Sequence, residues 1–297
     1  MTSPLISIII CTYNTKDLTC ECLDKLKTSI DFLKRPVETI VVENGNDGTG
    51  AVIKKKYPWV KLIEPSENTG FAKGNNLGIK LSDKNTKYYL LLNTDALVEK
   101  ETLKKAVEFM EGNSDCDVMG CRLKFGDGRM QPSAGFLPTP ENTTYWMLGL
   151  DALTDKQVHP KTADFFQKDR QVEWVMGAFL FMKSEVVKKT KGFDETFFMY
   201  MEEVEWCKRI NDTGFKIWYT PGFEITHLDK ASSGFDLRKP LTREMQGLVY
   251  YLKKYFPNSN LYMKIVIWLG VLGRFVGFGL LGNKLRSDIY KDILKVL

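Results

Sequence analysis

Four short polar clusters in the first hundred residues carry side chains that could do chemistry together. They are residues 11–14 (CTYN), 42–44 (VEN), 68–76 (NTGFAKGNN) and 92–95 (LNTD). Each cluster alone is typical of a turn. If they meet at one edge of a sheet, their carboxylates, small hydroxyls and glycines suit a base, a ribose and a diphosphate. The sequence therefore predicts a nucleotide site.

A second group of candidate residues is the acidic run Glu202-Glu203-Val204-Glu205. One interpretation is the first turn of an exposed helix, where acids face the positive end of the helix dipole. The other is a general base, which needs a carboxylate within reach of a reacting hydroxyl. Residues 115–117 also place two aspartates around one spacer, but they precede a predicted strand, and we interpret them as a solvated turn.

Strands and helices alternate through the first 123 residues. Apolar runs predict strands at residues 5–11, 37–43, 60–64, 87–93 and 117–122. Helical spacing predicts helices at residues 16–33, around 54–56, after a glycine-rich turn and up to about residue 81, and at 100–111. This alternation predicts βαβ units and a parallel sheet, in which ligands bind at the carboxyl ends of the strands.

The alternation ends near residue 124. Residues 126–128 predict a tight hairpin, and residues 131–170 are rich in loops and contain four prolines. A strand at 172–182, a helix near 202–213 and a strand at 215–220 follow, and residues 242–297 are expected to be helical. We therefore expect a domain over 1–240, with a nucleotide-binding half at 1–123 and an acceptor half at 124–240, and a basic helical tail at 241–297.

Composition excludes several other classes of protein. The 297 residues are 43% hydrophobic and 27% charged, as in a soluble globular chain, and six scattered cysteines are expected to be reduced thiols. Two histidines are too few for a clustered-histidine site. The net charge of +5 comes from the tail, where residues 253–297 hold eight basic and two acidic residues, so no nucleic-acid groove is expected.

Taken in chain order, the polar clusters resemble the motifs of the inverting family-2 glycosyltransferases. The matching segments are residues 7–14, 41–45, 68–76, 91–98, 177–182 and 192–209. The resemblance implies a GT-A fold with a Rossmann-like nucleotide-binding half, and transfer of a sugar from a dTDP- or UDP-linked donor. Residues 127–135 and the block that starts at Gly192 most resemble bacterial rhamnosyltransferases of cell-surface polysaccharide assembly, which implies rhamnose.

The resemblance also implies roles for individual residues. It implies nucleotide contacts from Thr12, Tyr13, Asn14, Glu43, Asn68, Gly70, Lys73, Asn75, Asn93 and Thr94. Glu43 would accept the imide N–H of uracil or thymine. Asp95 would hold Mg²⁺ or Mn²⁺ against the diphosphate, and His227 follows a strand where relatives carry a histidine near the metal. A satisfied structural histidine is an equal alternative for His227.

Within the acidic run, Glu203 matches the catalytic base of the family, and Glu202 would help to orient the site. A base opposite the leaving group implies one displacement with inversion. The family usually has aspartate where this chain has Glu43 and Glu203. An extra methylene moves a carboxylate by about 1 Å, so the backbone must sit further back or the acceptor must differ.

The tail contains an apolar stretch at residues 261–282 that Lys264 and Arg274 interrupt. The uncharged runs are shorter than the ~20 residues of a spanning helix, so no span is predicted. We expect a helix at the surface of an anionic membrane, with a helix buried against the domain as the alternative. The protein would then lie at the cytoplasmic face of the cell membrane, since no basic residue precedes the apolar run 5–11 as in a signal peptide. Its acceptor would be a saccharide or a polyprenyl-diphosphate-linked saccharide.

Two other functions remain open at this stage. A sugar-phosphate nucleotidyltransferase also binds nucleotides at a sheet edge, but it would need a glycine-rich loop with a basic residue after the first strand, where this chain has Cys11-Thr12-Tyr13-Asn14. An inactive nucleotide-binding scaffold is motivated by Asn93, where the family has an acid, and by the two glutamate substitutions.

Overall fold

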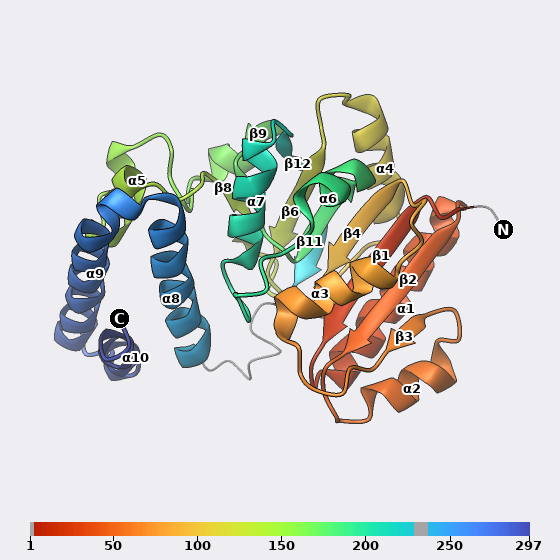
Figure 1. The fold of residues 1–297 in the computed structure, drawn as a ribbon, viewed down its shortest axis with the longest axis horizontal. Coiled ribbons are helices and arrows are strands. Elements are labelled where there is room, and N and C mark those ends of the chain that lie inside the picture. The colour runs from red at the N-terminus through yellow and green to blue at the C-terminus, as the bar shows by residue number, and fades with distance from the viewer. Residues whose placement is uncertain (1–2, 229–236) are drawn as a thin grey trace.

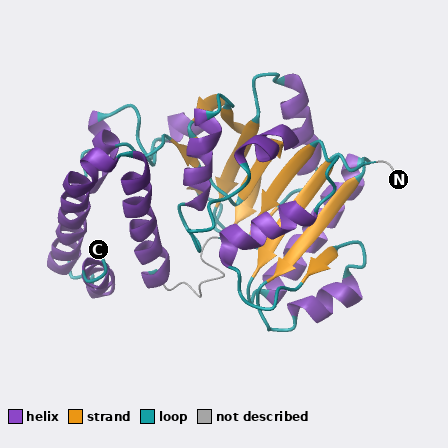
Figure 2. Cartoon of the chain, viewed as in Figure 1, coloured by secondary structure: helices purple, strands orange, loops and turns teal. Residues whose placement is uncertain are grey.

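The computed structural model describes residues 3–228 and 237–297, which form an α/β domain and a group of C-terminal helices (Figures 1 and 2). The strands are β1 (Ile6–Thr12), β2 (Val37–Glu43), β3 (Lys61–Ile63), β4 (Tyr88–Leu92), β5 (Ala96–Leu97), β6 (Val118–Lys124), β7 (Met130–Gln131), β8 (Ala134–Gly135), β9 (Arg170–Val172), β10 (Trp174–Val175), β11 (Phe179–Lys183) and β12 (Ile217–His227). The helices are α1 (Lys16–Leu33), α2 (Thr49–Lys56), α3 (Gly70–Leu81), α4 (Thr102–Gly112), α5 (Pro140–Leu148), α6 (Ser184–Thr190), α7 (Glu202–Asp212), α8 (Arg238–Tyr255), α9 (Asn260–Leu280) and α10 (Lys284–Leu294).

The central sheet has the order β3-β2-β1-β4-β11-β6-β12-β5. The first four strands in this order are parallel, as the sequence predicts, and β11 enters antiparallel between β4 and β6. The carboxyl ends of β1, β2 and β4 therefore lie at the same edge. At the far side, β5 pairs with the last residues of β12, with His227 opposite Ala96.

Helices cover both faces of the sheet, because β1 is apolar on both sides. Ile8 and Ile10 pack in the cluster formed with α1, α2 and α4, whereas Ile9 packs in the cluster that contains α3, α6 and α7. Helix α3 lies so close to β1 that a Cβ atom at Gly78 would be 2.4 Å from Ile9 Cγ2. This approach fixes the N-terminus of α3 at the carboxyl edge of the sheet.

The sequence predictions fail where the chain changes partners. The strand expected at 172–182 is three strands, because Val172 pairs with β12, Trp174 pairs with β8, and β11 joins the central sheet. The loop-rich segment contains α5, which begins in a capping box between Thr139 and Asn142 with a proline in the first turn. The expected boundary at 240/241 falls inside α8, and the final strand extends to His227. The hairpin around 126–128 is present between β6 and β7.

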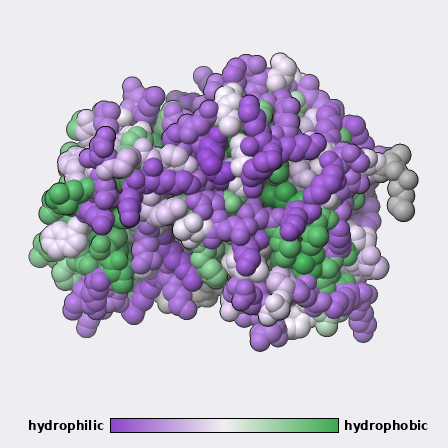
Figure 3. Space-filling model, in the orientation of Figure 1, coloured by the Kyte–Doolittle hydropathy of each residue, from purple (hydrophilic) through white to green (hydrophobic). Residues whose placement is uncertain are grey.

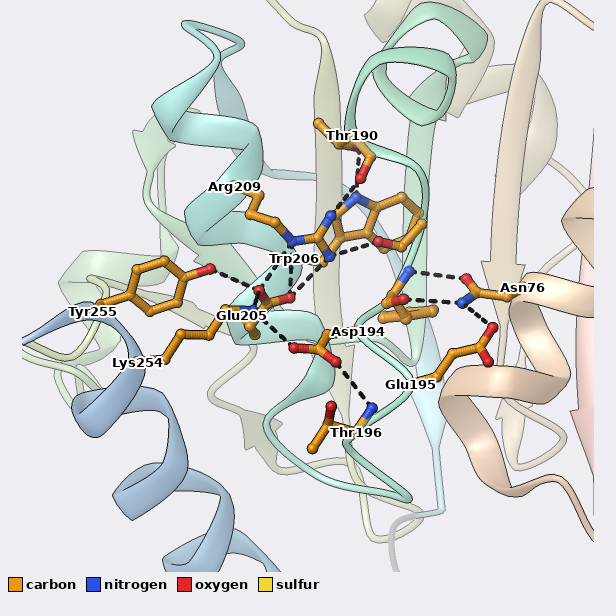
Figure 4. Close-up of polar contacts among 12 residues, drawn as sticks. Asn76, Thr190, Asp194, Glu195, Thr196, Glu205, Trp206, Arg209, Lys254 and Tyr255 are labelled. Carbon is orange, nitrogen blue, oxygen red and sulfur yellow. Dashed lines mark hydrogen bonds and ion pairs between the residues drawn. The ribbon is translucent and has the colours of Figure 1, made fainter.

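Helix α8 is joined to α7 by a buried group of charges around Glu205 (Figure 4). Glu205 is fully buried and accepts hydrogen bonds from Arg209, from Lys254 Nζ at 2.7 Å and from the Tyr255 hydroxyl at 2.7 Å. Lys254 also contacts Asp194 at 2.8 Å. Burial alone would raise the pKa of Glu205, but these hydrogen bonds outweigh burial and lower the pKa below its ordinary value. The expectation that Glu205 is an exposed acid on a helix face is therefore wrong.

We expect Glu205→Gln to lower the free energy of unfolding by about 3 kcal/mol, because Arg209 and Lys254 would lose a buried counter-charge. Asp212→Asn is the matched control on α7, since its pair with Lys208 is half exposed and such pairs contribute under about 1 kcal/mol. Chemical denaturation at pH 7 measures both. Equal effects of the two substitutions would show that the buried charges around Glu205 do not contribute more to the free energy of unfolding than an exposed ion pair does.

The pH dependence gives a second measurement of the same interaction. A carboxyl whose pKa is lowered by folding stabilises the protein above its unfolded pKa, and that stabilisation is lost as the pH falls through the folded pKa. The difference between the wild type and Glu205→Gln should therefore shrink as the pH drops below 4.5.

Candidate active site

A cavity of about 460 Å³ opens at the carboxyl edge of the sheet. The ends of β1 and β4, the start of α3, the loop before α7, His227 and the first turns of α8 line it. From the predicted site residues, the structure brings together Thr12, Tyr13, Asn68, Gly70, Asn93, Thr94, Asp95 and His227 in its walls. Parallel strands therefore gather three of the four polar clusters, and Asn44 of the remaining cluster also lines the cavity.

The end of β1 presents one held hydroxyl and one exposed ring. Thr12 is buried, and its Oγ1 lies 2.9 Å from the hydroxyls of both Thr15 and Thr19. Tyr13 is half exposed at the cavity. Asn14 is not in the cavity wall. It has a left-handed backbone (φ 52°), and its Oδ1 accepts a hydrogen bond from the Asn46 N–H, so it holds the turn after β2.

Glu43 is a buried carboxylate at the end of β2. One oxygen accepts a hydrogen bond from the Gly45 N–H. Its Oε2 has no hydrogen-bond partner among the described residues. Burial raises the pKa of Glu43, and the Gly45 N–H opposes that shift. An unpartnered buried acceptor is costly unless a ligand supplies a donor.

The start of α3 is held against two neighbours. Asn44 Oδ1 accepts hydrogen bonds from the Thr69 N–H and hydroxyl, at 3.0 and 2.8 Å. Gly70 has φ +74°, and a Cβ atom there would lie 2.8 Å from the Phe198 carbonyl oxygen, so glycine is required. The turn that contains Asn68 and Gly70 thus packs directly on the loop before α7.

Two residues of the same cluster lie elsewhere. Lys73 is exposed, outside the cavity wall, with Nζ 3.8 Å from Glu67. Asn75 is buried within α3, and its side chain donates to the Phe71 carbonyl at 2.9 Å. The structure therefore gives Asn75 a place in helix packing and leaves Lys73 on the surface. Neither lines the cavity.

Asp95 and His227 meet because β5 pairs with the end of β12. His227 Nε2 lies 3.3 Å from Asp95 Oδ1, and both side chains are buried. His227 Nδ1 lies 3.0 Å from Gln131 Oε1. In the neutral tautomer that donates from Nδ1 to this oxygen, Nε2 and Asp95 Oδ1 are both acceptors, and a divalent cation could bind both.

Asp95 and His227 could together hold a divalent cation that is also bound by the phosphates of a nucleotide. No group of three His, Cys, Asp or Glu side chains gathers within residues 3–228 and 237–297. Mg²⁺ and Mn²⁺ commonly take one or two protein ligands and complete their shell with phosphate oxygens and water. Asn93 Oδ1 is buried beside Asp95, without a hydrogen-bond partner in the part of the chain that the structure describes. By contrast, Asp115 is exposed and pairs with Lys216, as expected of a solvated turn.

At the start of α7, Glu202 is buried and Glu203 is half-buried, so neither is the exposed helix residue of the first interpretation. Each keeps one carboxylate oxygen that no group in the described ranges hydrogen-bonds. Burial raises the pKa of Glu203, and burial together with the charge of Glu203 raises that of Glu202 well above 4.5. Neither lies in the cavity wall. Cys11 does, and the pKa of its thiol is raised by burial and, to a smaller extent, by the charges of Glu43 and Glu202.

Sequence reasoning missed the residues that close the cavity opposite the sheet. Phe198, Met199 and Tyr200 come from the loop before α7, and Lys239, Pro240 and Arg243 come from α8. The Arg243 guanidinium lies 4.8 Å from the centre of the Phe198 ring, a cation–π contact. The spacing of four residues between Lys239 and Arg243 indicates that they share one face of a helix, but it does not indicate that this face lines a cavity.

Solved structures with a similar fold are glycosyltransferases. One is the mannosyltransferase PcManGT from Pyrobaculum calidifontis in complex with GDP-Man and Mn²⁺, with a TM-score of 0.59 and 16% identity, covering 100% of this chain and 75% of that one. Another is S. aureus TarS 1-349 in complex with UDP, with a TM-score of 0.54 and 16% identity, covering 93% and 74%. These likenesses confirm the predicted GT-A-type fold.

Relatives in sequence are similar over most of their length. An N-acetylglucosaminyl-diphospho-decaprenol L-rhamnosyltransferase of Mycobacterium tuberculosis is 26% identical over 236 residues, which are 74% of this chain and 75% of the relative. Rhamnosyltransferase WbbL of Escherichia coli is 23% identical over 265 residues, 86% of this chain and 96% of the relative. Residues 7–190, more than half of the chain, match the family Glycosyl transferase family 2. The chain therefore belongs to glycosyl transferase family 2.

Proposed function

We propose that this chain is an inverting glycosyltransferase that moves rhamnose from a dTDP- or UDP-linked donor to a saccharide or a polyprenyl-diphosphate-linked saccharide. The observation that carries the proposal is the cavity at the sheet edge, with buried, unpartnered carboxylate oxygens near it at Glu43, Glu202 and Glu203. The rhamnosyltransferase relatives support the sugar, and the diphospho-decaprenol in one relative's name supports a lipid-linked acceptor. Such an acceptor would place the protein at the cytoplasmic face of a membrane.

The nucleotide would lie along the ends of β1 and β2. Glu43 Oε2, which has no hydrogen-bond donor among the described side chains, would accept the imide N–H of uracil or thymine. Tyr13 offers an exposed ring beside the base, and Gly70 allows the backbone of α3 to come close to the ligand. These contacts select the nucleotide and orient the sugar toward α7.

The diphosphate would lie between Asp95 and the first turns of α8. Asp95 and His227 would hold Mg²⁺ or Mn²⁺ there, and the bound cation would offset the negative charge of the departing nucleoside diphosphate. Lys239 and Arg243 add positive charge from the opposite wall. Arg243 is positioned for this by its contact with the Phe198 ring.

Glu203 would act as the base. Its unpartnered oxygen would take the proton from the acceptor hydroxyl while that oxygen bonds to the anomeric carbon and the bond from that carbon to the diphosphate breaks. Because burial raises the pKa of Glu203, the carboxylate is a stronger base than an exposed glutamate. Attack from the side opposite the leaving group inverts the anomeric configuration.

Replacing Asp95 tests the cation site. Asp95→Asn keeps the shape of the side chain but removes its charge, so Mn²⁺ should no longer tighten the binding of a nucleoside diphosphate in calorimetry. Asp115→Asn, in the exposed pair of aspartates at residues 115–117, should leave the metal effect unchanged. If Mn²⁺ still tightened nucleoside diphosphate binding in Asp95→Asn, another residue would have to bind the cation.

Replacing Glu203 separates catalysis from binding. Glu203→Gln should keep donor affinity and lower the transfer rate by ~10² or more, because it removes the base but retains the shape. Glu202→Gln should reduce the rate less. In the wild type, the acid limb of the pH–rate profile should lie above pH 4.5, since the base must lose its proton and its pKa is raised.

The same two variants decide among the alternatives. A dead Glu202→Gln beside a fully active Glu203→Gln would assign the base to Glu202. Full activity in both would leave the start of α7 structural. A wild-type protein that binds donor but neither transfers nor hydrolyses it, with Mn²⁺ or Mg²⁺ present, would instead be a nucleotide-binding scaffold.

Replacing Arg243 tests the wall that α8 contributes. Arg243→Met removes the charge but keeps an apolar stem over Phe198, and we expect KM for the donor to rise by about 10- to 100-fold, the range for losing a charged hydrogen bond. Lys253→Met, an exposed cation on the same helix, is the control. An unchanged KM for the donor with a raised KM for the acceptor would instead assign Arg243 to acceptor binding.

A further inference from the structure

Helix α9 exposes a continuous line of large apolar side chains. We call the α9 stripe the six residues Leu261, Ile265, Trp268, Leu269, Val276 and Leu280, each between 43% and 84% exposed. Figure 3 shows hydrophobic surface at the left end of the view, where Figure 1 places α9. Single exposed apolar residues are common, but an aligned row of this length marks an interaction surface.

The spacing of the stripe places it on one face of the helix. Its members follow one another at intervals of three, four or seven residues, apart from the neighbours Trp268 and Leu269, so they share one side of an α-helix. The opposite side, which includes Met263, Ile267 and Val271, is buried against the rest of the protein. Helix α9 therefore has two apolar faces, of which only one has a partner within the described chain. At about 1.5 Å per residue, the stripe is roughly 29 Å long.

Exposed cations lie beside the stripe. Lys264 sits within its first turns, and Lys284, Arg286 and Lys291 are exposed on α10, which packs on α9 and has an exposed apolar side chain of its own at Leu285. This helix also has two aspartates, of which Asp288 is half-buried and Asp292 is paired with Lys295. An apolar surface with cations along its edge complements an anionic lipid surface. A symmetric contact with a second copy would instead bring these cations together.

The packing of α9 distinguishes lying on a membrane from crossing it. The segment Pro257–Leu280 is long and apolar enough to span, by length and composition. However, Arg274 donates hydrogen bonds to the carbonyls of Trp146 and Met147 at the end of α5, at 3.0 and 2.9 Å. A Cβ atom at Gly270 would lie 2.8 Å from the Met147 carbonyl oxygen, so the two helices are in close contact. A spanning α9 would have to break this interface and bury Arg274 in lipid.

We propose that the α9 stripe docks on an anionic membrane surface, with α9 lying in the plane of the interface. The cations of α9 and α10 would contact lipid phosphates while the stripe enters the boundary between head groups and acyl chains. That this docking brings the enzyme to its acceptor rests on the proposed function, because a polyprenyl-linked acceptor is confined to the membrane. The docking itself needs neither donor nor acceptor, so it is measured separately from activity.

Vesicle co-sedimentation of the full chain tests the surface. We expect binding to vesicles of phosphatidylglycerol and phosphatidylcholine, weaker binding to phosphatidylcholine alone, and loss of binding as salt is raised. Ile265→Glu with Leu269→Glu should weaken the partition coefficient at least about tenfold, since two apolar side chains no longer enter the lipid. Leu81→Glu, an exposed leucine at the end of α3, is the matched control and should bind like the wild type.

A charge variant and a soluble assay guard against misfolding of the double variant. Lys284→Glu with Arg286→Glu lies on exposed positions and should also reduce binding to anionic vesicles, while both double variants keep nucleotide binding in solution. Wild-type binding by both double variants would overturn the proposal. The proposal would also be overturned if the wild type did not bind vesicles but formed a dimer in solution, and Ile265→Glu with Leu269→Glu abolished that dimer.

The fluorescence of Trp268 tests the orientation. On binding, its emission should shift to the blue and be quenched more by lipids brominated near the head group than by lipids brominated near the bilayer centre. Trp268→Phe identifies its share of the signal among the six tryptophans. Stronger quenching from the bilayer centre would show a helix that crosses the membrane, and it would contradict the interfacial orientation.

Discussion

The attachment of α8 to α7 is the interaction on which the arrangement of the whole site depends. At the end of α8, Lys254 and Tyr255 bind the buried Glu205, and in its middle a Cβ atom at Gly247 would lie 2.9 Å from Met201 Cβ. At its start, Arg243 lies over Phe198. Three contacts along one helix thus hold it against the segment 198–205. Because ion pairs in a protein interior contribute only when every partner is satisfied, this geometry is specific as well as stabilising.

The segment fixed by α8 also aims the proposed catalytic carboxylates. Tyr200 and Met201 both have positive φ, at 74° and 72°, a conformation that side chains other than glycine rarely adopt. The close packing of α8 and of Gly70 on this loop maintains the conformation. Helix α7 therefore begins abruptly, with Glu202 and Glu203 in its first turn. The positive φ angles and the buried carboxylate oxygens without hydrogen-bond partners both destabilise the fold, and both features are typical of functional sites.

How much the sequence could predict follows from the range of the interactions involved. The strands that end at Thr12, Glu43 and Leu92 were predicted because continuous β-branched and apolar runs are a local signal, and parallel topology brings their ends together. The pairing of Asp95 with His227 depends on β5 and β12 meeting across 130 residues, and the resemblance, not the residue pattern, suggested it. The wall from α8 could not be predicted, since nothing local reveals that Lys239 and Arg243 face the cavity. Lys73 lies in the same motif as Asn68 and Gly70 but is exposed outside the cavity wall, and its contact with the nucleotide stays a prediction.

The C-terminal helices are attached to the rest of the protein at two places, one next to the exposed stripe and one next to the cavity. Arg274 and Gly270 hold α9 to α5, and the charges around Glu205 hold α8 to α7, so the exposed stripe is connected to the cavity through packed helices rather than through a linker. In the proposed function, docking the stripe would set the height of the cavity above the lipid surface. A polyprenyl-linked saccharide has its diphosphate at that surface, so a rigid connection limits which of its sugar hydroxyls reach Glu203. Membrane attachment would in this way contribute to acceptor selection as well as to local concentration.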